Sequence, residues 1–122
     1  MNIYSHTVPG IFKKAFTRKG RFIVFGDSVL TYAELKSHMG RFSSYFRQKG
    51  IRQGDRVILS SGNERFVCTF YLSLIANGIT VVYIDPESGP GRAHAIIDHC
   101  KAPFLFVDPA TQRNWNLLST ES

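Results

Sequence analysis

The chain has 122 residues, of which 43% are hydrophobic and 20% are charged, a composition typical of a folded globular protein. Its longest apolar run, residues 66–76, is far shorter than the roughly 20 residues that a membrane-spanning helix needs. The N-terminus has no basic segment followed by an apolar stretch, so the sequence predicts no signal peptide. We therefore expect a cytoplasmic protein with no membrane partner, whose length fits one domain or a piece of a larger one.

The net charge of +6 is unevenly distributed along the chain. Residues 1–56 contain eleven of the 15 Lys and Arg residues and three acidic residues, a balance of +8, whereas residues 57–122 carry −2. A basic half can bind nucleic acid or an anionic membrane surface, face solvent, or meet an acidic surface in a longer chain. Because no recognised binding motif accompanies the basic residues, a nucleic-acid-binding module is the least favoured hypothesis.

The two cysteines are isolated from each other in the sequence. This pattern predicts free thiols and a reducing compartment rather than a disulfide framework. Cys68 lies in a strongly apolar run with no neighbouring histidine, so we expect a buried and unreactive thiol there.

A short helix is predicted from Thr7, because apolar residues repeat at helical spacing over residues 11–16. Residues 21–25 form the first strand pattern, and Gly26-Asp27-Ser28 turns it into the short apolar pair at 29–30. The start of the chain is thus expected to contain a helix and a hairpin.

The clearest predicted helix covers residues 31–49. Thr31 and Glu34 form a capping box, in which the threonine oxygen accepts from the Glu34 amide and the glutamate bonds back. Lys49 in the last turn and Gly50 after it supply a favourable end. The apolar stripe of this helix consists of Tyr32, Leu35, Met39, Phe42 and Phe46.

Three further runs, at residues 56–60, 79–84 and 104–107, are apolar and typical of strands. A helix capped by Asn63 joins the first two, and its apolar residues lie nearly all round, so we expect it to be deeply buried. A helix after the loop Gly89-Pro90-Gly91 joins the last two, with Ala93, Ile96, Ile97 and Cys100 on its inner face.

This alternation predicts an α/β fold with a mainly parallel sheet covered by helices on both faces. We assign residues 1–109 to a partial N-terminal α/β subdomain and residues 110–122 to a C-terminal tail or linker. Within that tail, Trp115 is the only residue suited to anchor it.

No complete set of catalytic or metal-binding residues emerges from the sequence. His94 and Asp98 share a helix face, which favours a solvated i, i+4 pair over a metal site. The loop Gly89-Pro90-Gly91 lacks the lysine and the glycine pattern of a phosphate-binding loop. Asn63 and Asp85 stand just after strands, at the edge where open α/β sheets bind ligands, although both also suit helix capping and turns.

Three stretches in order resemble the start of the adenylate-forming superfamily, which includes acyl-CoA synthetases, luciferases and the adenylation domains of peptide synthetases. Leu30-Thr31-Tyr32-Ala33-Glu34-Leu35 matches the first core motif, LTYxEL, and residues 50–57, which contain Gly54, Asp55 and Arg56, are similar to the segment ending in GDRV. Residues 75–86 resemble the second core motif in the spacing from Gly78 to Asp85-Pro86, but Ala76, Asn77, Val81 and Tyr83 depart from it.

The resemblance implies a parent enzyme that uses ATP and Mg²⁺ to convert a carboxylic acid into an acyl-adenylate. The acyl group would then pass to the thiol of coenzyme A or of a carrier-protein phosphopantetheine. The motifs present here are mainly structural in that superfamily, so the resemblance assigns no catalytic, cofactor-binding or metal-binding residue to this chain. The residues carried over as structural are Thr31, Tyr32, Glu34, Gly54, Asp55, Arg56, Asn63, Gly78, Asp85 and Pro86.

The leading hypothesis is therefore an N-terminal fragment of a carboxylate-activating ligase that is inactive alone and has the remainder of the parent chain as its partner. We expect the isolated fragment to bind no ATP detectably and to self-associate through exposed strand edges. The alternative is a stand-alone, non-enzymatic α/β domain that binds a protein or small ligand at the carboxyl ends of its strands.

Overall fold

The computed structural model describes residues 20–25 and 28–117, with side chains described from residue 29 onward. The predicted N-terminal helix lies outside the described residues. The elements are β1 (Arg21–Phe25), β2 (Ser28–Thr31), α2 (Tyr32–Lys49), β3 (Arg56–Ser60), α3 (Glu64–Ala76), β4 (Thr80–Tyr83), α4 (Pro90–Cys100), β5 (Phe104–Val107) and α5 (Pro109–Asn114).

The parallel sheet is built around β3. β4 and β5 both pair with β3 in parallel, giving the order β4-β3-β5, with Ile58 of β3 opposite Val82 on one side and Leu105 on the other. The chain passes from β3 through α3 to β4 and then crosses to the far side of β3 through α4. The predicted α/β class with a mainly parallel sheet is confirmed.

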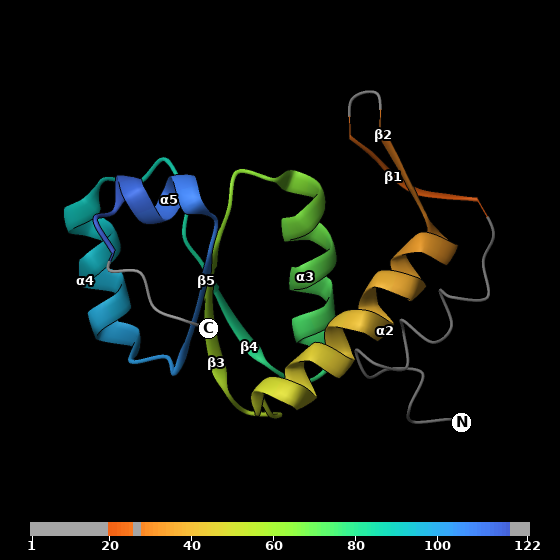
Figure 1. Ribbon diagram of the computed structural model, residues 1–122, viewed down its shortest axis with the longest axis horizontal. Coiled ribbons are helices and arrows are strands. Elements are labelled where there is room, and N and C mark those ends of the chain that lie inside the picture. The colour runs from red at the N-terminus through yellow and green to blue at the C-terminus, as the bar shows by residue number, and fades with distance from the viewer. Residues whose placement is uncertain (1–19, 26–27, 118–122) are drawn as a thin grey trace, which may run out of the picture.

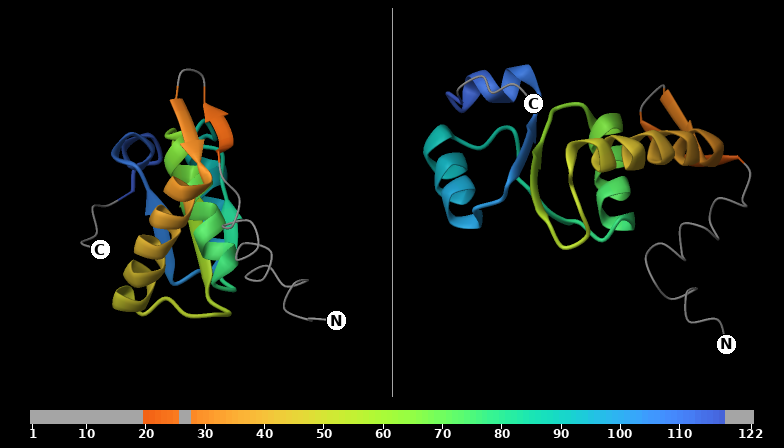
Figure 2. Two further views of the ribbon diagram at one scale, coloured as in Figure 1. Left: turned by 90° about the vertical axis from the view of Figure 1, so that its right-hand side faces the viewer. Right: turned by 60° about the horizontal axis from the view of Figure 1, so that its bottom comes forward.

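Helices cover both faces of this sheet. In Figure 1 and in the right-hand view of Figure 2, α2 and α3 lie on one side of the strands, and α4 and α5 lie on the other. The side chains of β3 alternate between the two layers, since Val57 and Leu59 belong to the core beneath α2 and α3, whereas Ile58 belongs to the core beneath α4. The residues of β3 after Arg56 are all buried, as a central parallel strand requires.

Helix α2 begins and ends as its sequence predicts. The Thr31 hydroxyl oxygen accepts from the Glu34 amide at 3.1 Å, and the Glu34 carboxylate accepts from the Thr31 amide at 3.3 Å. Gly50 closes the helix in the left-handed region at φ 76°, where a side chain would be strained. Leu35, Met39 and Phe46 of the predicted apolar stripe are buried.

The hairpin of β1 and β2 is confirmed, but it forms its own two-stranded antiparallel sheet. It stands beyond the N-terminal end of α2, away from the parallel strands (Figure 1). Leu30, at the end of the hairpin, packs in a small core with Leu35 and Met39 of α2 and with Leu72 and Ala76 of α3. This small core joins the hairpin to the α2–α3 layer.

The prediction that α3 is deeply buried is wrong for part of its surface. Its buried face consists of Thr69, Phe70, Ser73 and Leu74, whereas Tyr71 is 37% exposed. Thr69 and Ser73 can lie inside because each hydroxyl donates to a backbone carbonyl of the preceding turn of the helix. The presence of apolar residues on nearly all sides of α3 therefore overestimated how much of the helix is buried.

The cysteines are free, as predicted, but neither is fully buried. Cys68 and Cys100 are both half-buried. Burial raises the pKa of the Cys68 thiol, so at neutral pH it remains a poor nucleophile.

Residues 110–117 do not form the tail that the sequence led us to expect. Asp108 caps the short helix α5, and Trp115 directly after it is fully buried, with its indole Nε1 donating to the Ser88 carbonyl at 2.9 Å. His94 bonds through Nε2 to the Trp115 carbonyl at 2.5 Å, in place of the predicted pairing with Asp98. Trp115 is thus the anchor that the sequence singled out, and it holds α5 against α4.

We predict that Trp115→Ala lowers the free energy of unfolding by about 3–5 kcal/mol, because it removes a fully buried aromatic side chain. Trp115→Phe, the matched control, keeps most of the packing and loses the hydrogen bond to Ser88, for a cost of about 1–2 kcal/mol. Urea unfolding followed by circular dichroism measures both. Equal effects of the two variants would show that the ring contributes no packing energy.

Candidate functional site

The carboxyl edge of the parallel sheet is the place where this topology would bind a ligand. There the chain leaves β3 toward α3 on one face, whereas β4 and β5 lead to α4 and α5 on the opposite face (Figure 1). Diverging connections of this kind open a crevice above the strand ends. Three polar segments lie at this edge: residues 61–63 after β3, Asp85-Pro86 after β4 and Asp108 after β5.

Asp108 links the segments that follow β3 and β5 at this edge. Its Oδ2 accepts from the Gly62 amide at 2.9 Å and from the Ser61 hydroxyl at 3.2 Å, and its Oδ1 accepts from the Thr111 amide at 2.8 Å. The Ser61 oxygen also accepts from the Asn63 amide at 3.1 Å. One carboxylate therefore joins the loop after β3 to the start of α5.

Burial alone would raise the pKa of Asp108, but the hydrogen bonds from Thr111, Gly62 and Ser61 outweigh it and lower the pKa to about 2. Asp108 is therefore ionised at neutral pH. The amide of Gly62, which a phosphate would need at this loop, already donates to a negative group. A nucleotide phosphate does not fit at this loop as it stands, because it would have to displace a carboxylate of the same charge sign.

Asp85 and Pro86 form a turn rather than a site. The Asp85 carboxylate accepts from the Glu87 amide at 2.9 Å, and its backbone carbonyl accepts from the Ser88 amide at the same distance. The carbonyl of Pro86 accepts from the Asn114 side chain at 3.3 Å, so α5 also contacts this turn. Burial, Asp85 and Glu64 together raise the pKa of nearby Tyr83, which keeps its phenol neutral.

No catalytic constellation occurs in the part of the chain that the structure describes. Within residues 20–25 and 28–117, no three His, Cys, Asp or Glu side chains lie close enough to hold a metal ion. No helix among these residues is long and apolar enough to cross a membrane.

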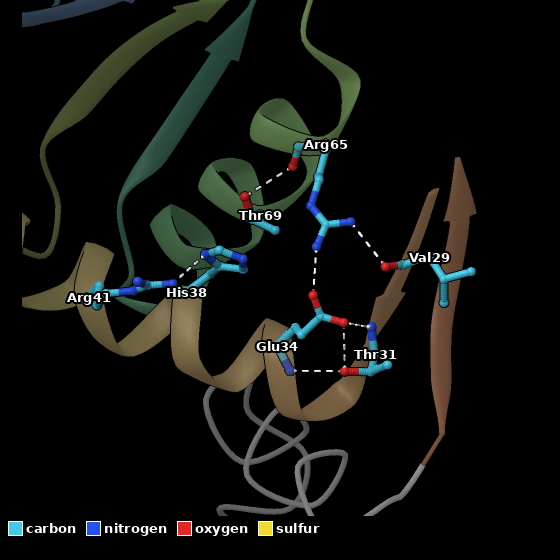
Figure 3. Close-up of polar contacts among 7 residues, drawn as sticks. All are labelled: Val29, Thr31, Glu34, His38, Arg41, Arg65 and Thr69. Carbon is cyan, nitrogen blue, oxygen red and sulfur yellow. Dashed lines mark hydrogen bonds and ion pairs between the residues drawn. The ribbon is translucent and has the colours of Figure 1, made fainter. Parts of the chain in front are cut away.

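The first motif is a joint between three elements. Glu34 of the capping box also accepts from Arg65 at the start of α3, at 2.8 Å, and Arg65 donates to the Val29 carbonyl of the hairpin at 3.0 Å (Figure 3). Hydrogen bonds from the backbone and hydroxyl of Thr31, opposed by burial and helped by Arg65, lower the pKa of Glu34. The motif thus fixes the hairpin, α2 and α3 relative to one another.

Next to this joint, His38 is held neutral. Its Nδ1 lies 2.9 Å from the Arg41 guanidinium (Figure 3), and an acceptor role for this nitrogen fits the neutral ring. Burial, with the positive charges of Arg41 and Arg65, lowers the pKa of His38. His38 therefore disfavours protonation in the folded chain.

The GDRV segment and the segment that resembles the second core motif meet at the amino ends of the parallel strands. The Gly54 amide donates to the Gly78 carbonyl at 3.0 Å, and the Thr80 amide donates to the Asp55 carbonyl at 2.9 Å. Gly78 has φ 71°, and a Cβ there would lie 2.8 Å from the Gln53 side chain, so only glycine fits without a shift. Arg56, in register with Thr80, is exposed at the start of β3.

The ten residues carried over from the resemblance therefore occupy separate joints and do not converge on one site. Asn63, one of them, caps α3 by accepting from the Phe66 amide at 3.0 Å. Tyr32 begins α2, and its amide donates to the Gly20 carbonyl at 3.0 Å. Sequence reasoning missed Asp108 and Arg65 as members of these joints. The repeated Asp-Pro dipeptide after β4 and β5 was a signal for Asp108, whereas nothing local distinguished Arg65.

A family model described as AMP-binding enzyme matches residues 12–121. Among curated proteins, the chain is 28% identical over 110 residues to the PKS-NRPS hybrid synthetase ATPKS of Aspergillus niger, a match that covers 88% of this chain and 6% of the relative. It is 25% identical over 92 residues to tyrocidine synthase 3 of Brevibacillus parabrevis, covering 75% of this chain and 1% of the relative. The chain thus spans only a small part of the length of these relatives.

Solved structures share the fold. Klebsiella oxytoca NpsA in complex with 3-hydroxyanthranilyl-AMSN matches with a TM-score of 0.78 at 22% identity, over 84% of this chain and 21% of that one. The four-domain nonribosomal peptide synthetase holo-AB3403, bound to AMP and glycine, matches with a TM-score of 0.79 at 23% identity, over 96% of this chain and 9% of that one.

We predict that Asp108→Asn lowers the free energy of unfolding by about 1–2 kcal/mol at pH 7, allowing for partial solvent screening of the carboxylate. Because the folded pKa lies below the ordinary aspartate value of 3.8, this contribution is present above pH 3.8 and is lost as pH falls toward 2. Urea unfolding at several pH values should show the wild type and the variant converging in acid. A difference that stays constant with pH would contradict the ionised, bonded carboxylate.

The capping box gives a second prediction. Thr31→Ala removes the side-chain acceptor for the Glu34 amide and should cost about 1 kcal/mol of folding free energy. Thr31→Ser keeps the hydroxyl oxygen and serves as the matched control, with a smaller loss. Chemical unfolding of the two variants, compared with the wild type, tests this. Equal stability of Thr31→Ala and Thr31→Ser would show that the cap contributes nothing.

Proposed function

This chain belongs to the AMP-binding enzyme family, and on that premise we propose that it is the N-terminal part of an ATP-dependent carboxylate-activating ligase. The observation that carries the proposal is the family match over residues 12–121, together with relatives that are peptide synthetases. In the proposed reaction the acid carboxylate attacks the α-phosphate of ATP, forming an acyl-adenylate and releasing pyrophosphate. The acyl group then passes to the thiol of coenzyme A or of a carrier-protein phosphopantetheine.

Within that enzyme, we assign this chain a structural task. At the carboxyl edge of the sheet the Asp108 carboxylate accepts from the Gly62 amide of the loop after β3, while the buried Ser60 hydroxyl beside it has no hydrogen-bond partner among the described residues. The motif residues close joints between elements, as Glu34 does with Arg65 and Gly54 with Gly78. A scaffold of this kind positions the segments that bind nucleotide and acid, and it needs none of those ligands to fold.

ATP, Mg²⁺ and the thiol acceptor would accordingly be bound by the remainder of the parent protein, which is the partner we propose for this chain. The chain alone is then inactive.

A hybrid protein tests the proposed function. The part of Klebsiella oxytoca NpsA that this chain matches is replaced by residues 1–122, and acid-dependent ATP–pyrophosphate exchange is measured with 3-hydroxyanthranilate, the acid portion of the ligand in that protein's structure. We expect exchange by the hybrid and none by the isolated chain. Unmodified NpsA is the positive control, and the hybrid without acid is the negative control.

Two results would contradict the proposal. Exchange by the isolated chain would show that it carries a catalytic apparatus of its own. A folded hybrid that binds the acid but never exchanges pyrophosphate would show that this chain cannot serve as the first part of an adenylation domain.

A further inference from the structure

A groove lined by aromatic side chains opens on the α2–α3 face of the sheet. It has a volume of about 360 Å³, within the range of roughly 300–1,000 Å³ that is typical of small-molecule sites. None of its lining residues belongs to the polar segments at the carboxyl edge or to the ten motif residues. The described residues that line it are Arg41, Phe42 and Tyr45 of α2, Phe66 and Phe70 of α3, and Phe106 of β5.

The rings of this aromatic groove offer contact surface to a planar ligand. Phe70 is buried, whereas the other four rings are half-buried. The Phe42 ring lies edge-on to Phe70 with centroids 5.1 Å apart, and the Phe106 ring is tilted against Phe70 at 4.9 Å. Aromatic rings attract one another in stacked and in edge-to-face arrangements, so rings set at these angles suit an added aromatic ring.

Arg41 is the charged residue of the groove. Its guanidinium donates to the neutral ring of His38 at 2.9 Å (Figure 3), a bond that leaves its positive charge uncompensated. Among the described residues Arg41 has no acidic partner, since Glu34 pairs with Arg65. A guanidinium holds five N–H donors in a planar fork that matches a carboxylate. Arg41 and Tyr45 also line a second groove along α2, so this charge stands at the boundary of the aromatic groove.

We propose that the aromatic groove binds an aromatic carboxylate, whose ring lies among the aromatic side chains and whose carboxylate pairs with Arg41. The charge of the site selects this class of ligand. A neutral aromatic molecule or an apolar protein segment would fill the groove and leave the Arg41 charge without a partner in a less hydrated place, which is unfavourable. The inference does not rest on the proposed function, because binding here requires neither ATP nor catalysis.

A second copy of this chain is a poorer occupant. It would bring another net charge of +6 toward a groove whose boundary is already positive. Like charges brought together across a contact oppose association, whereas a carboxylate supplies the opposite charge.

Calorimetric titration of the full-length chain at pH 7 tests the site with two probes, 2-naphthoate and its uncharged counterpart 2-naphthamide. We expect the wild type to bind 2-naphthoate roughly tenfold more tightly than 2-naphthamide, because only the acid pairs with Arg41. In Arg41→Gln this preference should fall to within about twofold. Lys36→Gln is the matched control, since it removes an exposed positive charge from α2 outside the aromatic groove and should keep the preference. Circular dichroism verifies that each variant folds.

His38 reports where the acid binds. Burial, then the positive charges of Arg41 and Arg65, lower the pKa of His38, whereas Glu34 raises it. A carboxylate beside Arg41 offsets part of that positive charge, so saturating 2-naphthoate should raise the pKa of His38 and 2-naphthamide should not. Nuclear magnetic resonance of the His38 ring protons measures this.

The comparison of the two probes on the wild type stands even if a variant fails to fold. No saturable binding of 2-naphthoate, or equal affinity for both probes, would overturn the proposal. An equal loss of preference in Lys36→Gln and Arg41→Gln would overturn it as well, by showing only a general attraction of the basic helix. A dimer in light scattering that 2-naphthoate does not dissociate would assign the groove to a second copy. Binding that depends on Arg41 in the isolated chain but not in the NpsA hybrid would assign it to the remainder of the parent protein.

Discussion

The burial of β3 on both faces, with a parallel neighbour at each edge, is the constraint on which the other elements depend. Val57 and Leu59 point into the core beneath α2 and α3, and Ile58 points into the core beneath α4. A strand in this position cannot satisfy its backbone with water, so β4 and β5 must pair with it. The helices that cover its two faces then follow from the crossovers that parallel pairing requires.

Hydrogen bonds and an ion pair between polar residues fix the positions of the loops and helices around this central strand. Asp108 closes the carboxyl edge by binding the loop after β3 and the start of α5. At the amino ends of the strands, one backbone hydrogen bond joins Gly54 to Gly78 and a second joins Thr80 to Asp55, which holds the two turns together. Farther away, Arg65 and Glu34 join α3 to α2 and the hairpin (Figure 3). The family motifs in this chain lie at such joints, which gives their residue types a physical reason that requires no bound nucleotide.

Much of this fold could be predicted because its signals are local. The capping box at Thr31 and Glu34, the helix end at Gly50 and the apolar strands depend on neighbouring residues alone, and all are confirmed. Contacts between distant residues could not be predicted in the same way. Arg65 reaches Glu34 from 31 positions away, and the indole of Trp115 finds Ser88 from 27 positions away. The predicted His94–Asp98 pair was wrong for the same reason, since a tertiary partner, the Trp115 carbonyl, took the histidine.

We propose that this chain is a scaffold in which the Asp108 carboxylate already holds the Gly62 amide at the carboxyl edge of the sheet, so that it contributes to carboxylate activation without binding nucleotide itself. A titration of the ¹⁵N-labelled chain with Mg·ATP, followed by nuclear magnetic resonance, tests this most directly. The account predicts no saturable shift of the Gly62, Asn63, Asp85 and Thr111 amides, which lie at the carboxyl edge of the sheet. Saturable shifts confined to these amides would contradict it, because they would show that a nucleotide displaces Asp108 and binds at this edge.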